Sequence, residues 1–318
     1  MSSLLTSNAA GADMDTMRER FTTVTTELLD QDPHVALVLA DIGVPPFRES
    51  GAYRRHPDRV INVGIREQLM IGVGAGMALE GLKPIIHTYA PFLIERPFEQ
   101  IKLDFGHQGV SGVLVSIGAS ADWVEGGRTH MAPGDVALMG TLPGWDIFVP
   151  GHPDEGEEAL RTAIDGGRCS YIRLSTQQNQ RSIPGAVEGL VMVRPARRGA
   201  PLVIAVGPML DDTLTATADL DVAVAYTARP APFDEEALRR FASAELVVVE
   251  PYLEGTSAHR INQAVDRPLR LLSLGFGRDE LRHYGSAREH RAAWGIDASG
   301  LRSRIEEFLK PRRPVFAG

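Results

Sequence analysis

Short apolar runs and stretches with helical spacing alternate along the chain. The run VALVLA (residues 35–40) is continuously apolar, as is typical of a parallel strand that is buried on both faces, and VLVSI (residues 113–117) predicts a further strand. Residues 17–29 instead carry apolar side chains at near-helical spacing. Because strand and helix patterns alternate, the sequence predicts an α/β fold with two doubly wound domains and a mostly parallel sheet in the first.

The first half of the chain contains further predicted elements. We expect strands over residues 60–63, 83–88, 146–149 and 171–174, and helices over residues 97–105, 135–142 and 154–164. A helix-like stretch begins after Gly64 and ends at Gly81, where a glycine commonly terminates a helix.

A Pro-, Gly- and Arg-rich segment around residues 183–200 interrupts this alternation and predicts a domain boundary. The pattern then restarts, with strands over 202–206, 222–226, 246–250 and 269–274 and helices over 234–242, 256–264 and 300–309. We therefore expect four parts: a flexible tail (1–15), a first domain (16–185), a linker (186–200) and a smaller second domain (201–318).

Composition narrows the class of protein. A chain of 318 residues is long enough for two domains, and its net charge of -8 disfavours a nucleic-acid partner. The single cysteine, Cys169, predicts neither an intrachain disulfide nor a cysteine-based zinc site, which favours a cytoplasmic protein. The N-terminal residues lack the basic and apolar regions of a secretory signal, and no apolar run approaches the ~20 residues that span a bilayer.

Three alternating glycines, Gly72, Gly74 and Gly76, lie inside the helical pattern that follows Gly64. They are not a dinucleotide-binding fingerprint, because that motif needs its glycines between strand and helix. Glycine inside a helix costs about 1 kcal/mol, so we expect a compensating close contact with another helix or another subunit.

Several polar and aromatic residues follow predicted strands, where ligands bind in open α/β sheets. These are Asp41, Glu67, the pair Tyr89 and Phe92, and His130 in a glycine-rich loop. Each also has a structural interpretation: Asp41 as a cap, Glu67 at a helix N-terminus, the aromatics as core, and His130 as a buried histidine. The sequence has no metal-ligand spacing, no GxSxG motif and no P-loop.

The order of motifs resembles one known family. Asn62 to Gln68 (NVGIREQ) followed by a glycine-rich helix resembles the pyrimidine-binding domain of the transketolase superfamily. Tyr89-x-x-Phe92, then RPFEQ (96–100), GRTH (127–130) and VPGHPD (149–154), follow in the order of that family. Residues 246–264 and 274–301 are similar to the C-terminal domain of the same enzymes, so the resemblance covers about residues 16–310.

The resemblance also implies that half of an enzyme is missing. A full transketolase is about twice as long, and its first half holds the cofactor diphosphate through a GDG…N motif and a divalent metal; no such motif occurs here. The chain therefore resembles the C-terminal subunit of a split transketolase. A separate diphosphate-binding subunit is the implied partner, in an α2β2 assembly whose active site lies between the subunits and whose Mg2+ is held mainly by the partner.

Thiamine diphosphate is the implied cofactor, and the resemblance assigns residues to it. Glu67 is the catalytic carboxylate that hydrogen-bonds the pyrimidine nitrogen, Tyr89 and Phe92 stack on the ring, Asp41 lies near the thiazolium, and Arg96 is a further cofactor-binding residue. A carboxylate in an apolar pocket is well suited to share a proton with a ring nitrogen.

The resemblance also implies residues that meet a small ketose or a related substrate. His130 is the second catalytic residue and lines the substrate channel, with Arg18, Glu125 and Arg173 as substrate-binding residues. The substrate half of the site departs from the family at several positions, namely Pro45, Gly126, Met131 and Thr176. Loss of an arginine where Thr176 stands would weaken binding of a phosphorylated substrate, so we expect an unusual substrate.

Three functions compete on this evidence. The first is ketol transfer by a transketolase-like enzyme. The second is the β subunit of a 2-oxo acid dehydrogenase E1 or a deoxyxylulose-phosphate-synthase-like carboligase, and the third is a non-catalytic regulatory subunit. The loop ending in Thr129 and His130 favours ketol transfer over E1 chemistry, and the joint presence of Glu67, the aromatic pair and His130 argues against a silent chain.

Overall fold

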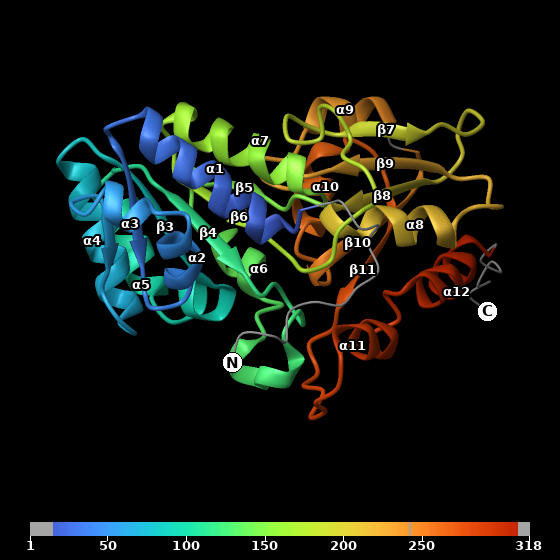
Figure 1. The fold of residues 1–318 in the computed structure, drawn as a ribbon. Helices are drawn as coiled ribbons and strands as arrows, with labels where there is room; N and C mark the ends of the chain where they lie inside the picture. The colour runs from blue at the N-terminus through green and yellow to red at the C-terminus, as the bar shows by residue number, and fades with distance from the viewer. Residues whose placement is uncertain (1–14, 242, 311–318) are drawn as a thin grey trace.

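The computed structural model describes residues 15–241 and 243–310, and Figure 1 shows two α/β halves side by side. Apart from Asp15, the tail predicted over residues 1–15 lies outside the described residues. Within the described residues, no helix is both long and apolar enough to cross a membrane.

The first sheet contains six strands, all parallel, in the order β2-β1-β3-β4-β6-β5. Its strands are β1 (Val35–Leu39), β2 (Val60–Asn62), β3 (Lys83–Tyr89), β4 (Val113–Ile117), β5 (Asp146–Phe148) and β6 (Ser170–Arg173). The order reverses between β1 and β3, so the carboxyl ends of these neighbours form the kind of crevice where α/β proteins bind ligands.

Helices cover both faces of this sheet, which is why strands such as β1 and β4 are buried along their whole length. Alternate residues of β1 point to opposite sides: Leu37 packs in one hydrophobic cluster and Val38 in the other. The first side is covered by α1 (Met17–Gln31), α2 (Val44–Glu49), α3 (Ala52–Arg55) and α7 (Pro153–Gly166). The second side is covered by α4 (Glu67–Leu79), η1 (Pro91–Glu95), η2 (Ile101–His107) and α6 (Asp135–Met139). The short helix α5 (Phe98–Gln100) lies between η1 and η2 in the chain and has no buried residue.

The second sheet has five strands in the order β11-β10-β8-β9-β7, and only β7 is antiparallel to its neighbour. Its strands are β7 (Val191–Arg194), β8 (Leu202–Val206), β9 (Ala223–Thr227), β10 (Glu245–Leu253) and β11 (Arg270–Phe276). Its helices are η5 (Gly207–Met209), α8 (Leu210–Ala216), α9 (Glu235–Phe241), α10 (Ala258–Ala264), α11 (Ala287–Ala293) and α12 (Ala298–Leu309).

The predicted α/β class with a mostly parallel first sheet is confirmed, and the differences are local. Strand β7 lies inside the segment predicted as a linker, and it was missed because its four residues are only half-buried. The helix predicted over 97–105 is instead the short α5 followed by the π-helical η2. A π-turn contains one more residue than an α-turn, so it shifts the apolar spacing from which helices are predicted. The domain boundaries themselves stay a prediction.

Buried contacts join the two halves. The edge strand β5 and its continuation donate two backbone hydrogen bonds to the second half, from Ile147 N to Ala231 O (2.7 Å) and from Val149 N to Ala228 O (2.7 Å). The buried carboxylate of Glu155 on α7 accepts a hydrogen bond of 2.6 Å from the Tyr226 hydroxyl on β9. Both hydrophobic clusters also continue from one sheet into the other.

The glycines of α4 differ in what surrounds them. A Cβ at Gly74 would collide with the Ile86 side chain on β3, so the absence of a side chain lets this helix approach the sheet. The close contact expected with another helix is thus, at Gly74, a contact with a strand. Gly76, two residues further along, has open space around its Cβ position and is exposed.

We expect Gly74→Ala to destabilise the protein by about 1–3 kcal/mol, because the added methyl group overpacks the contact with Ile86. Gly76→Ala is the matched control, and it should instead stabilise by about 0.5–1 kcal/mol through its higher helix propensity. Urea denaturation of the two variants checks this; equal midpoints would show that Gly74 does not set the helix–sheet distance.

Candidate active site

Four strands end at the same edge of the first sheet and bring the predicted residues together. Asp41 follows β1, Glu67 begins α4 just after β2, Tyr89 is the last residue of β3, and Gly118 follows β4. Because parallel strands share one carboxyl edge, residues separated by up to 77 positions meet here.

The carboxylate of Glu67 is the most deeply buried charge in this group, with a side chain that is 3% exposed. Its Oε1 accepts a hydrogen bond of 2.6 Å from Arg96 Nη1, and the Arg96 side chain is 41% exposed. Glu67 also lies in the first turn of α4, where the helix dipole favours a negative charge. The site therefore holds a buried carboxylate whose charged partner reaches it from the surface.

Aromatic rings form a cluster beside this ion pair. Ring centroids of Tyr89 and Phe92 lie 6.3 Å apart, and His130 lies 6.0 Å from Tyr89 and 5.1 Å from Phe92. Trp123 completes the cluster, 4.4 Å from His130 and 5.4 Å from Tyr89. Gly118 makes room for it, because a Cβ there would collide with the Tyr89 ring.

The imidazole of His130 is oriented by the loop that carries it. Its Nδ1 lies 2.9 Å from the carbonyl oxygen of Gly126, which can only accept, so Nδ1 carries the proton in this contact. In the neutral ring, Nε2 is then the basic nitrogen. A Cβ at Gly126 would lie 2.8 Å from the His130 ring, so the glycine permits this close packing.

Asp41 is held in a strained conformation at the end of β1. Its φ of 60° lies in the left-handed region, which non-glycine residues seldom occupy. Asn62 stabilises it with two hydrogen bonds of 2.9 Å, one accepted from the Asp41 backbone N–H and one donated to its carboxylate. Strained backbone conformations of this kind are typical of functional positions. Asp41 is also exposed at the carboxyl edge of the sheet.

The three residues predicted to bind substrate differ in their surroundings. Arg18 on α1 lies close enough to Tyr89 for its charge to oppose the effect of burial, which raises the pKa of that phenol. Glu125 is exposed in the loop that carries His130. Arg173 is enclosed within the chain, because its side chain is 1% exposed and donates to Asp135 (2.7 Å) and Ser120 (2.5 Å).

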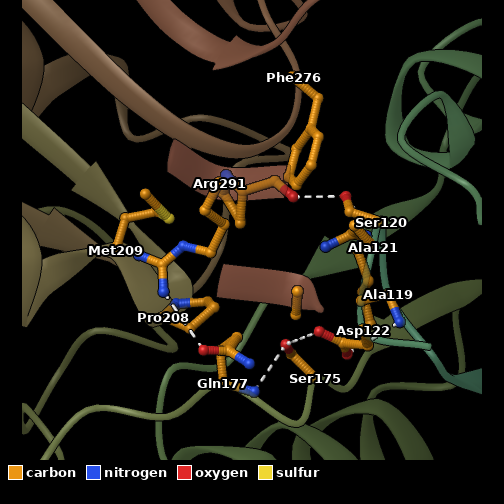
Figure 2. Close-up of a pocket in the computed structure, with 13 residues that line it drawn as sticks. Ala119, Ser120, Ala121, Asp122, Ser175, Gln177, Pro208, Met209, Phe276 and Arg291 are labelled. Carbon is orange, nitrogen blue, oxygen red and sulfur yellow. Dashed lines mark hydrogen bonds between the residues drawn. The ribbon is translucent and has the colours of Figure 1, made fainter. Parts of the chain in front are cut away.

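Arg173 belongs to a network that connects the two halves. Ser120 extends this network into the second half by donating a hydrogen bond of 2.6 Å to the carbonyl oxygen of Pro251 on β10. The same region lines a cavity of about 20 Å³, which has room for about one water molecule. Figure 2 shows Ser120, Asp122 and Arg291 around it; burial raises the pKa of Asp122 and lowers that of Arg291. Neither Glu67 nor His130 lines this cavity.

The packing roles of three residues in the site were not predicted from the sequence, which named Gly126 only as a departure from the family. Trp123 is part of the aromatic cluster, and Gly118 and Gly126 make space for Tyr89 and His130. A signal was present, since all three lie in the glycine-rich loop after β4, but a glycine-rich pattern does not say which ring each glycine accommodates. Among the described residues, no group of three or more His, Cys, Asp or Glu side chains is placed to hold a metal ion.

Comparison with known proteins gives the family. The model of the transketolase pyrimidine-binding domain matches residues 13–181. A protein of Rhodococcoides fascians, described as an uncharacterized 33.6 kDa protein in the fasciation locus, is 46% identical over 297 residues, which cover 91% of this chain and 93% of that one. This chain therefore belongs to the transketolase family, and the family indicated by its motifs is confirmed.

More distant relatives indicate what part of a transketolase the chain resembles. One subunit of the apulose-4-phosphate transketolase of Actinobacillus succinogenes is 26% identical, covering 90% of this chain and 94% of its own. The 1-deoxy-D-xylulose-5-phosphate synthase of Shewanella sediminis is 29% identical over 85% of this chain, but this chain spans only 45% of its length. The solved structure of a split-gene transketolase, an inactive β4 tetramer, shares the fold with a TM-score of 0.78 at 23% identity, covering 93% and 99% of the two chains.

His87 on β3 lies close behind the site and is fully buried. Its Nδ1 donates to the carbonyl oxygen of Val115 (2.8 Å), and its ring packs 4.6 Å from that of Phe21. Burial lowers the pKa of His87 from 6.5 to about 3. The folded protein therefore keeps this ring neutral at a pH at which the unfolded chain binds a proton.

This depressed pKa makes a prediction about acid stability. The stabilising effect of the neutral ring is complete above pH 6.5 and is lost as the pH falls from 6.5 towards 3, at about 1.4 kcal/mol per pH unit. Replacement His87→Gln keeps a donor for Val115 but does not titrate, so its stability should fall less between pH 7 and pH 4.5. Urea midpoints at both pH values check this, and parallel losses in the two proteins would contradict it.

Proposed function

We propose that this chain is one subunit of a thiamine-diphosphate-dependent, transketolase-like enzyme that transfers a two-carbon ketol unit. The observation that carries the proposal is the burial of the Glu67 carboxylate at the carboxyl edge of a parallel sheet, where Arg96 joins it to Phe92 in the aromatic cluster. The predicted cytoplasmic location belongs to the same proposal.

The described residues fit the pyrimidine ring of this cofactor. A flat nitrogen heterocycle needs a hydrogen-bonding group at its edge and an apolar surface against its face, and Glu67 and Phe92 lie side by side, linked by Arg96. Glycines at positions 118 and 126 allow the Tyr89 and His130 rings to pack close to the loop that follows β4. Within this chain, the pyrimidine would be held by these groups and by Tyr89.

Thiamine diphosphate, when bound, supplies the carbanion-stabilising chemistry of such an enzyme. Glu67 would hold a proton at the pyrimidine nitrogen, and its burial keeps water from competing for that proton. Phe92 and Tyr89 would orient the ring. His130, with Nε2 as its basic nitrogen, would move a proton at a substrate oxygen. Asp41 would face the thiazolium side of the site.

The proposal includes a separate partner subunit; among the described residues, no group of three or more His, Cys, Asp or Glu side chains is placed to hold the metal. We place the diphosphate and Mg2+ mainly on that partner, in an α2β2 assembly. Support comes from the similarity to one subunit of another transketolase over nearly the whole length of that subunit. Large exposed apolar side chains occur around α4, at Ile65, Leu69 and Leu79, and on η2, at Leu103, and we propose them as the apolar docking surface for the partner.

The substrate is a small ketose or a related compound. Arg18 and Glu125 lie near the aromatic cluster and remain the proposed substrate-binding residues. Arg173 is occupied by Asp135 and Ser120 within the chain, so a substrate would have to displace a buried ion pair to reach it. We therefore propose that Arg173 acts on the site through the Ser120 loop.

A carboligase of the deoxyxylulose-phosphate-synthase type is the second candidate. The 29% identity to such a synthase over 85% of this chain favours it. Both candidates use the same residues around Glu67 and differ in the donor, because a ketose gives a two-carbon ketol unit, whereas a 1-deoxy sugar needs an acetyl unit from a 2-oxo acid that loses CO2. Product analysis of the reconstituted pair, with an aldose acceptor and either a ketose or a 2-oxo acid as donor, distinguishes them.

Replacement Glu67→Gln should lower the activity of the reconstituted pair by at least ~100-fold, because an amide cannot exchange a proton with the ring nitrogen as a carboxylate does. Steady-state assays at saturating cofactor measure the loss. Glu236→Gln, an identical change at an exposed position of α9, is the matched control and should retain activity. Unchanged activity of the Glu67 variant would refute the assigned chemistry.

Replacement Leu69→Glu should prevent assembly with the partner, because it introduces a charge into the proposed apolar docking surface. Size-exclusion chromatography with light scattering measures the mass of the mixed subunits. Tyr284→Glu adds the same charge at an exposed aromatic residue outside this surface and should leave the assembly intact. Assembly of the Leu69 variant at wild-type concentrations would place the interface elsewhere.

A further inference from the structure

Arg96 makes both of the contacts that the proposed function assigns to the pyrimidine ring. Its Nη1 donates to Glu67 Oε1 at 2.6 Å, and its guanidinium carbon lies 4.2 Å from the centre of the Phe92 ring. One side chain therefore satisfies the carboxylate and covers the aromatic face at the same time.

The shape of the guanidinium explains this double contact. It is a flat group of nitrogens around one carbon, it donates hydrogen bonds in its plane, and it stacks on aromatic faces. An aminopyrimidine is also flat, and its nitrogens likewise lie in the plane of the ring. The guanidinium and the aminopyrimidine therefore compete for Glu67 and Phe92, because each can hydrogen-bond the carboxylate in its own plane and stack its face on the aromatic ring.

We propose that Arg96 is a placeholder for the cofactor's pyrimidine ring. In the cofactor-free chain it pairs with Glu67 and covers Phe92, and it leaves both when the ring binds. This inference rests on the proposed function, and it changes the role predicted for Arg96 from holding the cofactor to competing with it.

The chemistry of Glu67 requires the exchange. Arg96 donates a proton in its hydrogen bond and retains it, so Glu67 beside it is an acceptor only. A carboxylate that shares a proton with a ring nitrogen must instead have that proton between itself and the nitrogen. Arg96 and the pyrimidine nitrogen would both bind at the buried carboxylate of Glu67. The ion pair between Glu67 and Arg96 must therefore open before Glu67 can act on the cofactor.

The surroundings of Arg96 allow its side chain to move while its backbone stays in place. The side chain is 41% exposed, so it can reach solvent without disturbing the core, whereas Glu67 is 3% exposed and cannot. The backbone is fixed by the π-helical hydrogen bond from Arg96 N to Pro91 O (3.1 Å) and by the bond that Gln68 Nε2 donates to Arg96 O (3.4 Å).

The placeholder has a function before the cofactor arrives. A buried carboxylate without a partner is costly, and the first turn of α4 would have to hold one in the cofactor-free chain. Arg96 removes that cost, but the cofactor must then displace an existing ion pair. The side chain thus stabilises the empty site and weakens the binding of the cofactor.

The test measures cofactor affinity in Arg96→Met, which keeps an apolar chain against Phe92 but removes the guanidinium. Thiamine diphosphate and the fragment 4-amino-2-methylpyrimidine are titrated into the full chain, alone and with its partner subunit, and intrinsic tryptophan fluorescence reports binding beside Trp123. Both ligands should bind the variant about ten-fold or more tightly than they bind the wild type. The unliganded variant should also melt at a lower temperature.

Two further variants make the result specific. Arg96→Lys keeps the charge but loses the flat group, so its affinity should lie between those of wild type and Arg96→Met. Arg240→Met removes an exposed arginine on α9 and should change neither affinity nor melting temperature.

The outcomes of these titrations distinguish a failure of the placeholder role of Arg96 from a failure of the proposed function. Equal or weaker binding by Arg96→Met overturns the placeholder and returns Arg96 to the cofactor-binding residues, while the proposed function stands. If thiamine diphosphate binds neither wild type nor variant in the presence of the partner, the proposed function and the placeholder both fall. A variant that does not fold is replaced by Arg96→Gln, to which the same criteria apply.

Discussion

The buried carboxylate of Glu67 is the constraint on which the site depends. A charged group at 3% exposure needs a partner, and the fold provides one by placing Arg96 at the end of a π-helical turn and α4 with its N-terminus at the carboxylate. The turn also carries Phe92, so one short segment determines both the charge balance and the aromatic surface of the site. Gly74, on the same helix, allows α4 to lie close against the sheet.

Those parts of the fold that depend on local pattern could be predicted from the sequence. The strands β1, β4 and β8 are buried on both faces, so their apolar runs were unambiguous. Strand β7 is half-buried and antiparallel, and its pattern gave no such signal. The π-turns η1 and η2 were also missed, because they break the helical period on which the prediction relied.

For the candidate site, the residues at strand ends could be predicted from the sequence, but the contacts made by loops could not. Asp41, Glu67 and Tyr89 follow or end parallel strands, and parallel strands end at one edge, so their convergence could be derived before any coordinates were known. The ion pair between Glu67 and Arg96 and the position of Trp123 depend on how loops fold over that edge. The burial of Arg173 depends on the second half of the chain, through Pro251, and no local pattern around Arg173 reports it.

Glu155 has a consequence for motion. Its carboxylate accepts hydrogen bonds from Gly151 N (2.8 Å), Ile183 N (2.9 Å) and the Tyr226 hydroxyl (2.6 Å), all within the junction of the two halves. Of these donors only Tyr226 belongs to the second half, so bending at this junction would leave the buried carboxylate of Glu155 one donor short and is therefore opposed. Closure around a ligand by bending between the halves would break this buried hydrogen bond, whereas a change of shape in the glycine-rich loop of residues 118–134 would leave it intact.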